Sequence, residues 1–190
     1  MFTRLDSNHK HVSRRSSVYA RNVVAASQPL AAQAGVQILR NGGNAVDAAI
    51  ATAITLTVVE PTMNGIGSDA FVIVSDNHGI HGFNGSGRSP ATWTPERFAG
   101  HDNMPEHGWD TVTVPGAVDT WVQLSDRFGQ LPFEKLFDSA INYAAQGFAV
   151  SPVIAAGWAR AAEEFGYLEG FKTIFMPNGR APTAGEAFQS

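Results

Sequence analysis

Apolar residues recur every four positions between Leu30 and Ile38 and predict a helix that begins near Pro29. Proline suits the first helical turn because its missing N–H has no intrahelical partner there. Ser27 is the predicted N-cap of this helix. The run Asn41-Gly42-Gly43 is predicted to end it, since glycine readily takes the left-handed conformation of a C-terminal cap.

The second predicted helix spans Ala45–Val59 and is apolar on nearly every side. A helix that is apolar all round is normally buried, so we expect this one to lie between other layers. Asn44 is its predicted N-cap, and Asp47 falls in the first turn, where a carboxylate complements the helix dipole. Pro61 follows the predicted end. Ahead of both helices, residues 23–25 are predicted to form a short buried strand.

A β-hairpin is predicted after the helix pair, with strands at 70–75 and 80–83 joined by a turn over 76–79. A glycine-rich loop, residues 64–69, leads into the first strand. Residues 84–90 leave the second strand as another loop. The glycine-rich loop follows a helix and opens a strand, whereas a phosphate-binding loop follows a strand and opens a helix, so we expect no phosphate site.

The remaining chain is predicted to be a surface loop and three helices. The surface loop covers residues 91–110, and a short strand is predicted at 111–114. The three helices are predicted at 117–129, 133–144 and 151–165, and the end of the chain, residues 171–190, is predicted to be irregular. Helical spacing places several apolar side chains on the inner faces of these helices, among them Val118, Trp121, Val122, Leu124 and Ile141. Helices followed by a hairpin and more helices favour an α+β fold, or a layered α/β arrangement with an antiparallel sheet.

Composition changes this picture in one respect. The 190 residues are 44% hydrophobic and only 16% charged, and self-contained domains usually carry more charge than this. The interpretation is that some surface is covered by a partner chain or by another part of the protein. The net charge of −4, with no basic helix face, argues against nucleic acid as a partner.

The sequence has no cysteine, which excludes disulfides, thiol catalysis and cysteine-based zinc sites. Its loop histidines lack the helical pairing of a zinc protease, so no metal site is predicted; they are His78, His81, His101 and His107. No apolar run is long enough to span a membrane, and residues 1–22 contain no secretory core, so a cytoplasmic protein is expected.

Arg88 is the candidate binding residue that the sequence singles out, because it lies in a glycine-flanked loop after a strand. A guanidinium there can hold a substrate carboxylate through two parallel hydrogen bonds. The alternative is a surface or structural salt bridge, and the sequence does not separate the two. The segment 84–87 is not a serine-hydrolase elbow, which requires a helix after the serine, and no catalytic residue is assigned.

Two segments carry a resemblance to a known family. Val24-Ala25-Ala26-Ser27-Gln28-Pro29-Leu30-Ala31, followed by Gly42-Gly43-Asn44-Ala45-Val46-Asp47-Ala48-Ala49, is similar to the opening of γ-glutamyltranspeptidases. Glu60-Pro61, the glycine-rich turn, the apolar strand, the arginine-containing loop and Val114-Pro115-Gly116 follow in the family's order. The resemblance covers residues 22–190, the N-terminal portion of a large subunit, with residues 1–21 as a tail.

The resemblance implies an N-terminal-nucleophile (Ntn) hydrolase with a four-layer αββα sandwich, of which this chain is an incomplete part. In this family a precursor cleaves itself, and the new N-terminal threonine attacks an amide with its own amine as base. That threonine belongs to a region that this sequence does not contain. The implied substrates are γ-glutamyl amides such as glutathione or glutaryl amides such as cephalosporin side chains, without a cofactor. The implied partners are the remaining large-subunit and small-subunit segments, and an exposed sheet would also allow a homo-oligomer.

Two departures from the family pattern concern substrate binding. When the loop is aligned on Pro90, Ser86 occupies the place of the carboxylate-binding arginine, and Arg88 comes two residues later. Ser86 and Arg88 are therefore the candidate substrate-binding residues. The glycine stretch before the strand ends Ser68-Asp69-Ala70, and both this change and the displaced arginine point toward the acylase-like branch. The first hypothesis is that the chain is a fragment of a γ-glutamyl transferase or hydrolase. The alternatives are a glutaryl or cephalosporin acylase and a non-catalytic binding module.

Overall fold

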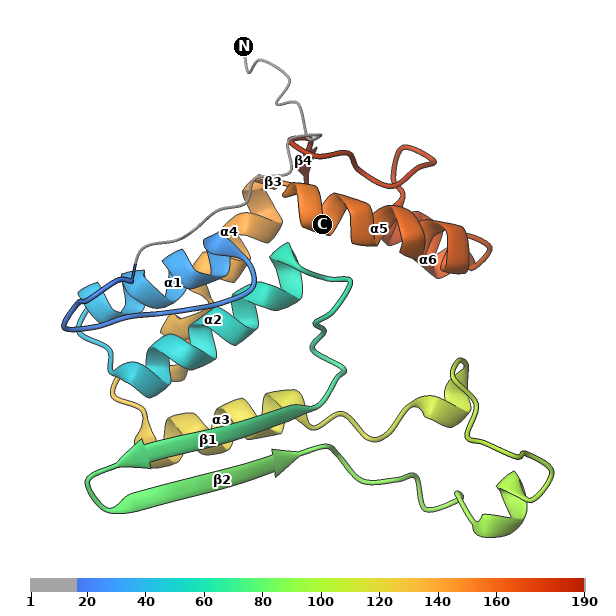
Figure 1. Cartoon of the computed structure of the whole chain (residues 1–190), viewed down its shortest axis with the longest axis horizontal. Coiled ribbons are helices and arrows are strands. Elements are labelled where there is room, and N and C mark those ends of the chain that lie inside the picture. Colours follow the sequence, from blue (N-terminus) through green and yellow to red (C-terminus); the bar gives the residue numbers. More distant parts are fainter. Residues whose placement is uncertain (1–16, 190) are drawn as a thin grey trace.

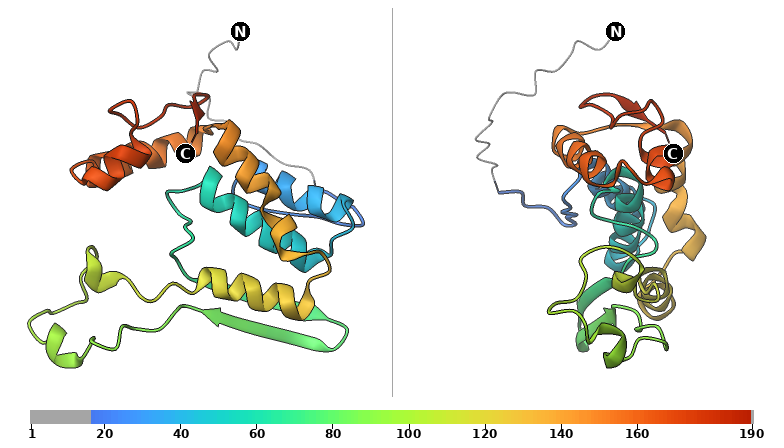
Figure 2. Two further views of the ribbon diagram at one scale, coloured as in Figure 1. Left: turned by 180° about the vertical axis from the view of Figure 1, so that it is seen from behind. Right: turned by 90° about the vertical axis from the view of Figure 1, so that its right-hand side faces the viewer.

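The computed structural model describes residues 17–189 (Figure 1). Helices α1 (Pro29–Arg40) and α2 (Ala45–Val59) form an antiparallel pair joined by a four-residue connection, as predicted. Hairpin strands β1 (Ala70–Asp76) and β2 (Gly79–Gly85) lie below α2, and helix α3 (Ala117–Phe128) runs beside them (Figures 1 and 2). The arrangement confirms the predicted α+β class, with helices on one face of an antiparallel hairpin.

The start of α2 is held by the residues that the sequence indicated. The side-chain oxygen of Asn44 accepts from the backbone N–H of Val46 and Asp47, at 2.9 and 3.0 Å, and the Asp47 carboxylate accepts from the N–H of Asn44 at 2.9 Å. This reciprocal pair is a capping box. The expected burial on all sides is wrong, because Ala45 and Ala49 are exposed along one side of α2.

The N-terminus of α1 differs from the prediction by one residue. Gln28, not Ser27, is the N-cap, and the Ser27 hydroxyl instead donates to the Glu60 carboxylate. Glu60 is buried at the C-terminal end of α2, but the antiparallel packing brings it beside the N-terminus of α1, which has no acidic residue in its first turn. Its charge therefore complements the dipole of the neighbouring helix.

The predicted strand at 23–25 is wrong. These residues are an irregular segment with Val23 largely exposed, and no strand among residues 17–189 pairs with them. The predicted strand at 111–114 is wrong for the same reason. A short 3₁₀ helix, η2 (Trp109–Thr111), stands at its start, and the only backbone bond of Val114 within the described chain is from its N–H to the Arg88 carbonyl oxygen at 2.9 Å. A short apolar run becomes a strand only where a partner strand is available.

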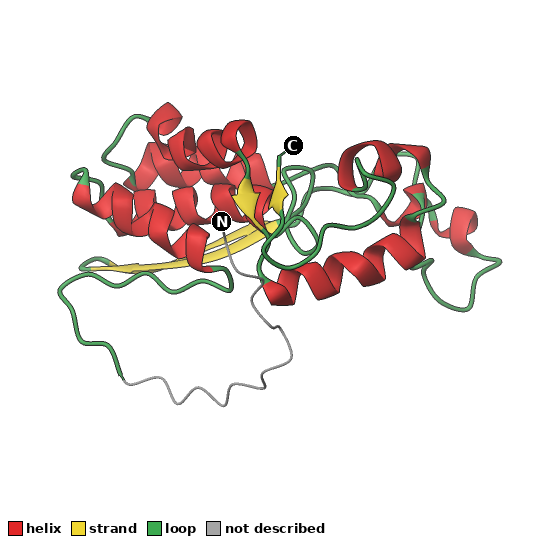
Figure 3. Ribbon diagram, turned by 90° about the horizontal axis from the view of Figure 1, so that it is seen from above, coloured by secondary structure: helices red, strands yellow, loops and turns green. Residues whose placement is uncertain are grey.

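The hairpin is confirmed, with Ala70 paired to Gly85 at its open end and Asp76 to Gly79 at its turn. The Asp76 carboxylate closes the turn by accepting from the N–H groups of His78 and Gly79 at 2.7 and 3.0 Å. These bonds, the His78 N–H first, lower the pKa of Asp76. One hairpin face packs into a core with α2 and α3, and the helices lie over the strands when seen from above (Figure 3).

The loop and helices that follow are largely as predicted, with differences in which faces are buried. Trp121 and Leu124 of α3 are buried, but Val118 and Val122 are exposed, as is Ile141 of α4 (Asp138–Gln146). These three predictions of inward side chains are wrong. The single helix predicted at 133–144 is a 3₁₀ turn, η3 (Phe133–Phe137), followed by α4, and the surface loop contains another short 3₁₀ helix, η1 (Pro95–Phe98).

A second core forms around Trp158 in the C-terminal part. Helix α5 (Pro152–Phe165) confirms the helix predicted at 151–165, and Ser151 is its N-cap. Helix α6 (Glu169–Phe175) and the two-residue strands β3 (Phe148–Ala149) and β4 (Ala187–Phe188) were not predicted. The centres of the Trp158 and Phe188 rings lie 4.6 Å apart, and the indole N–H of Trp158 donates to the Phe175 carbonyl oxygen at 2.9 Å. Elements this short carry too few residues for a periodic pattern.

An ion pair in the last segment gives a pH prediction. Two Arg180 nitrogens donate to the Glu186 carboxylate at 2.9 and 3.2 Å, and this lowers the pKa of Glu186 from 4.5 to about 2. The pair therefore stabilises the fold above pH 4.5, and this stability is lost as the pH falls toward about 2. We expect Glu186→Gln to reduce the pH-dependent part of the free energy of unfolding by about 1 kcal/mol or less, because the pair is partly exposed.

Urea unfolding between pH 6 and pH 3 measures this effect. Arg180→Gln should remove only part of it, because the Arg180 guanidinium is the first cause of the lowered pKa of Glu186 but the Thr183 N–H and hydroxyl also donate to this carboxylate. If neither substitution changes the pH dependence of the free energy of unfolding, the pair is not formed in solution.

Candidate functional site

The loop that carries Arg88 is fixed to the segment before α3. The Arg88 carbonyl accepts from the N–H of Val114 at 2.9 Å, and the Ser86 carbonyl accepts from the Thr113 hydroxyl at 3.0 Å. The N–H of Ser86 donates to the side chain of Asn84 at 3.1 Å. Residues 84–88 are thus held to a neighbouring segment and do not project freely from the end of β2.

Three glycines allow these segments to approach so closely. Gly87 has φ +73°, and a Cβ on it would lie 1.7 Å from the Val114 carbonyl oxygen. A Cβ on Gly116 would lie 2.2 Å from the Gly85 carbonyl oxygen, and one on Gly85 would lie 1.8 Å from the Thr120 hydroxyl. No side chain fits between the two segments, so glycine is required at their crossing.

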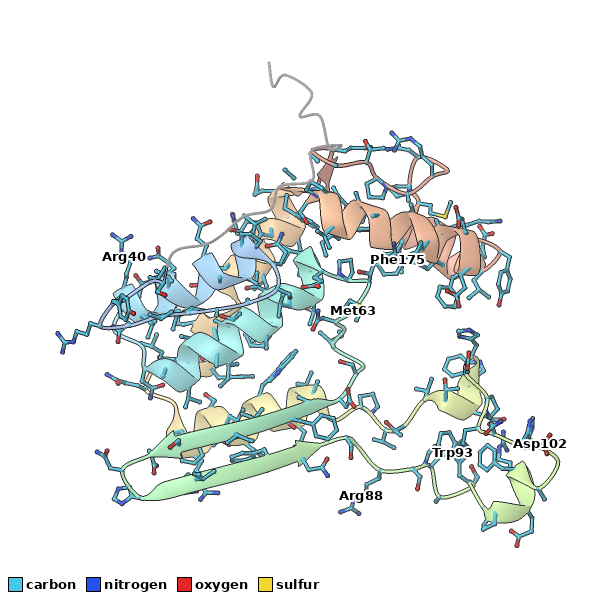
Figure 4. All side chains as sticks on the ribbon, viewed as in Figure 1. Arg40, Met63, Arg88, Trp93, Asp102 and Phe175 are labelled. Carbon is cyan, nitrogen blue, oxygen red and sulfur yellow. The ribbon has the colours of Figure 1, made fainter. Side chains whose placement is uncertain are left out.

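The Arg88 side chain is exposed and points away from the body of the protein (Figure 4). None of the salt bridges formed among residues 17–189 includes it. By contrast, Arg97 donates twice to Asp110, at 2.9 and 2.7 Å. The salt-bridge alternative for Arg88 is therefore not found within the described chain, and the guanidinium is placed where it can receive an anionic group.

Ser86 lies in the same loop but is half-buried, and its hydroxyl is 3.5 Å from the Gly87 carbonyl oxygen. The structure therefore brings both predicted residues onto one anchored loop, with only the arginine reaching into solvent. The nearby Thr113 and Thr120 hydroxyls donate to backbone carbonyls, to Ser86 at 3.0 Å and Gly116 at 2.9 Å. Their roles in this structure are to hold the loop and the helix.

The glycine-rich loop meets the arginine loop at the start of α3. The Ser68 carbonyl accepts from the N–H groups of Gly116 and Ala117, at 3.1 and 3.0 Å, and so caps the helix N-terminus. Since Ala70 pairs with Gly85, both loops leave the hairpin at its open end. A cavity of about 230 Å³ lies behind the glycine-rich loop, against α2 and α3, and neither Ser86 nor Arg88 lines it.

Sequence reasoning missed the part of this site that lies before α3. Thr113 and Gly116 hold the two loops in place, although they follow Arg88 by more than twenty residues. The available signal was the Pro115-Gly116 pair directly before a helix, which marked a special backbone position but not its partner. The contact across the surface loop is visible only in three dimensions.

The histidines do not form a metal site within residues 17–189, where no group of three metal-binding side chains gathers. His81 lies 3.3 Å from the Asp76 carboxylate and 3.2 Å from an Arg127 nitrogen, at the turn end of the hairpin. His107 lies 3.0 Å from the Glu164 carboxylate. Within the same stretch, no helix has the length and hydrophobicity required to cross a membrane.

Comparisons with known proteins agree on one family. The sequence profile described as gamma-glutamyltranspeptidase matches residues 31–190. The glutathione hydrolase-like YwrD proenzyme of Bacillus subtilis is 35% identical over 177 residues, which cover 92% of this chain and 34% of that protein. The chain thus spans about a third of the length of this relative.

Solved structures give the same result. The cephalosporin acylase of Bacillus halodurans is 45% identical, with a TM-score of 0.90 over 100% of this chain and 37% of the other. The γ-glutamyltranspeptidase of Helicobacter pylori is 27% identical, with a TM-score of 0.85 over 93% of this chain and 52% of the other. Both the transpeptidase and the acylase branches therefore share this fold.

Proposed function

Since this chain belongs to the γ-glutamyltranspeptidase family of Ntn hydrolases, we propose that the complete protein hydrolyses amide bonds or transfers their acyl groups. The observation that carries the proposal is the anchored, outward-facing Arg88, on a loop that the family match includes. The nucleophile would be the N-terminal threonine of a small subunit formed by self-cleavage, outside residues 1–190. The 190-residue chain alone is then inactive.

In this proposal Arg88 binds the carboxylate of the acyl donor. A planar guanidinium offers two parallel N–H donors, which suits a carboxylate and fixes its orientation. Ser86 and the loop 64–69 shape the adjoining surface, because both are tied to the start of α3 by way of Thr113 and Gly116. The remaining large-subunit and small-subunit segments would complete the pocket around this arginine.

The first candidate donor is a γ-glutamyl amide such as glutathione, as the names of several relatives suggest. A glutaryl or cephalosporin side-chain amide is the second candidate. It is favoured by the high identity to a cephalosporin acylase and by Arg88 standing two residues beyond the family's usual arginine position. Both donors present a carboxylate, so the role of Arg88 is the same in each.

We expect Arg88→Ala in the complete protein to raise KM for a carboxylate-bearing donor by about 10- to 100-fold, since it removes a charge-assisted pair of hydrogen bonds. The readout is steady-state release of p-nitroaniline from the anilide of the donor. Arg40→Ala is the matched control, because Arg40 is also exposed but lies on α1, well away from the loop (Figure 4). An unchanged KM for Arg88→Ala would remove this residue from substrate binding.

The acyl donor is decided by comparing γ-glutamyl and glutaryl p-nitroanilides. Cleavage of the first by the complete protein, with none by the 190-residue chain, supports a γ-glutamyl enzyme. Cleavage of only the glutaryl compound supports the acylase alternative. If the complete protein neither cleaves itself nor releases nitroaniline from either compound, the non-catalytic binding module is the correct description.

A further inference from the structure

The imidazole of His81, on β2, lies between a carboxylate and a guanidinium at the turn end of the hairpin. Its Nε2 is 3.3 Å from the Asp76 carboxylate, and its Nδ1 is 3.2 Å from a terminal nitrogen of Arg127. Asp76 is the last residue of β1, whereas Arg127 is in the last turn of α3, which ends above the hairpin turn (Figure 1). The imidazole therefore connects the hairpin to α3 through its two ring nitrogens.

The two partners determine which nitrogen of the neutral imidazole carries the proton. A guanidinium has only donors and keeps its charge, so Nδ1 must accept from Arg127 through its lone pair. An ionised carboxylate only accepts, so Nε2 must carry the proton and donate to Asp76. The Asp76 carboxylate stays ionised, because the His78 N–H first, and then the His81 ring and the Gly79 N–H, lower its pKa.

The other charged or titratable groups of the surrounding elements do not bind the ring. They are His78 on the turn, Asp119 and Asp126 on α3, and Asp47 on α2. Among the bonds formed within residues 17–189, none joins one of these four groups to the imidazole of His81. The uncharged neighbour is Phe128, whose ring centre lies 5.1 Å from that of His81.

We propose that His81 is a pH-dependent switch, which releases Arg127 and the end of α3 from the hairpin when the imidazole is protonated. The added proton occupies the Nδ1 lone pair, so the bond from Arg127 is lost and two cations lie 3.2 Å apart. The bond to Asp76 becomes charge-assisted and stronger, so the ring stays on the turn. Arg127 keeps its contacts with the rings of Phe128 and Phe83, whose centres lie 4.9 and 5.9 Å from the guanidinium carbon.

The switch is suited to mild changes of pH. Histidine is the side chain whose charge ordinarily changes between about pH 5 and pH 8. The His81 side chain is 22% exposed, so a proton from water reaches it in the folded protein. The cluster is at the turn end of the hairpin, opposite the open end from which the loop with Arg88 leaves (Figures 1 and 4). The inference is therefore independent of the proposed reaction.

Hydrogen–deuterium exchange of the complete protein measures the release of α3. From pH 8 to pH 5, exchange of the amides of residues 124–131, corrected for the intrinsic effect of pH, should become at least about threefold faster. His81→Gln should abolish this response, because its side-chain amide can accept from Arg127 and donate to Asp76 but takes up no proton. His107→Gln is the matched control and should retain the response, since His107 pairs with Glu164 instead.

Histidine-selective ¹⁵N labelling reads the position of the proton directly, with His81→Gln identifying the signals of His81. We expect a proton on Nε2 and none on Nδ1 at pH 8. A proton on Nδ1 at that pH would overturn the proposal, because Arg127 could not then donate to it. The proposal would also be overturned by an exchange rate that does not respond to pH, or by a response that persists in His81→Gln.

A second variant keeps the test valid if His81→Gln does not fold. Arg127→Met removes the donor that protonation is proposed to release and keeps an unbranched side chain of similar length. Exchange of residues 124–131 in this variant should be the same at the two pH values after correction. A pH response equal to that of the unmodified protein would show that Arg127 is not the group that the imidazole releases, and would overturn the proposal.

Discussion

Replacing Asp47 with alanine is expected to lower the free energy of unfolding by about 3–5 kcal/mol. Its side chain is fully buried and accepts from three backbone N–H groups: Asn44 at 2.9 Å, Gln130 at 3.1 Å and Leu131 at 3.3 Å. The substitution removes the shared acceptor of all three N–H groups and leaves a gap where the buried carboxylate stood. It also separates the start of α2 from the segment that follows α3, so the effect extends beyond one helix cap.

Urea unfolding of the chain and its variants measures this effect. Asp47→Asn keeps one carbonyl oxygen but loses the charge, and we expect a smaller loss of about 1–2 kcal/mol. Asp119→Ala is the matched control, because Asp119 is also in the first turn of a helix but is exposed, and within residues 17–189 its side chain accepts only from Gln123. It should cost less than about 1 kcal/mol. Equal losses for Asp47→Ala and Asp119→Ala would show that water replaces the buried carboxylate.

Gly87→Ala is the second substitution with a large expected effect. The added Cβ would lie 1.7 Å from the Val114 carbonyl oxygen, and the φ of +73° is itself unfavourable for alanine. The loop must therefore move, which breaks the bonds from Val114 to Arg88 and from Thr113 to Ser86. We expect a loss of about 3 kcal/mol or more in the free energy of unfolding.

Two glycine substitutions separate the causes of that loss. Gly42→Ala has a similar positive φ of +93° but no atom within 4 Å of the new Cβ, so it should cost only about 1–2 kcal/mol. Gly67 has neither a positive φ nor an atom within 4 Å of the new Cβ, so Gly67→Ala should hardly change the free energy of unfolding. If Gly87→Ala costs no more than Gly42→Ala, the two segments are not packed as closely as the structure indicates.

In the complete protein, Gly87→Ala should also raise KM, because the displaced loop carries Arg88. Arg88→Ala should raise KM without the loss of stability. The two variants therefore distinguish the effect of displacing the arginine from the effect of removing its charge.

The sequence by itself determined the local elements of this protein. The capping residue Asn44, the glycines after Arg40 and the alternation in the hairpin predicted α1, α2, β1 and β2 nearly to their bounds. These signals are local, since caps and turns depend on a few neighbouring residues. The motif around Gly42–Ala49 likewise indicated the family, and the glycine-flanked loop after the second predicted strand indicated the candidate arginine, Arg88.

Only the tertiary structure decided which residues act together. The Ser27–Glu60 bond, the contacts of Asp47 with residues 130 and 131, and the crossing at Gly87 and Val114 join positions far apart in the chain. Residues 23–25 and 111–114 have the apolar composition of strands but lack partners within the described chain. Strand formation and burial depend on which other segments come near, so a periodic pattern cannot determine them.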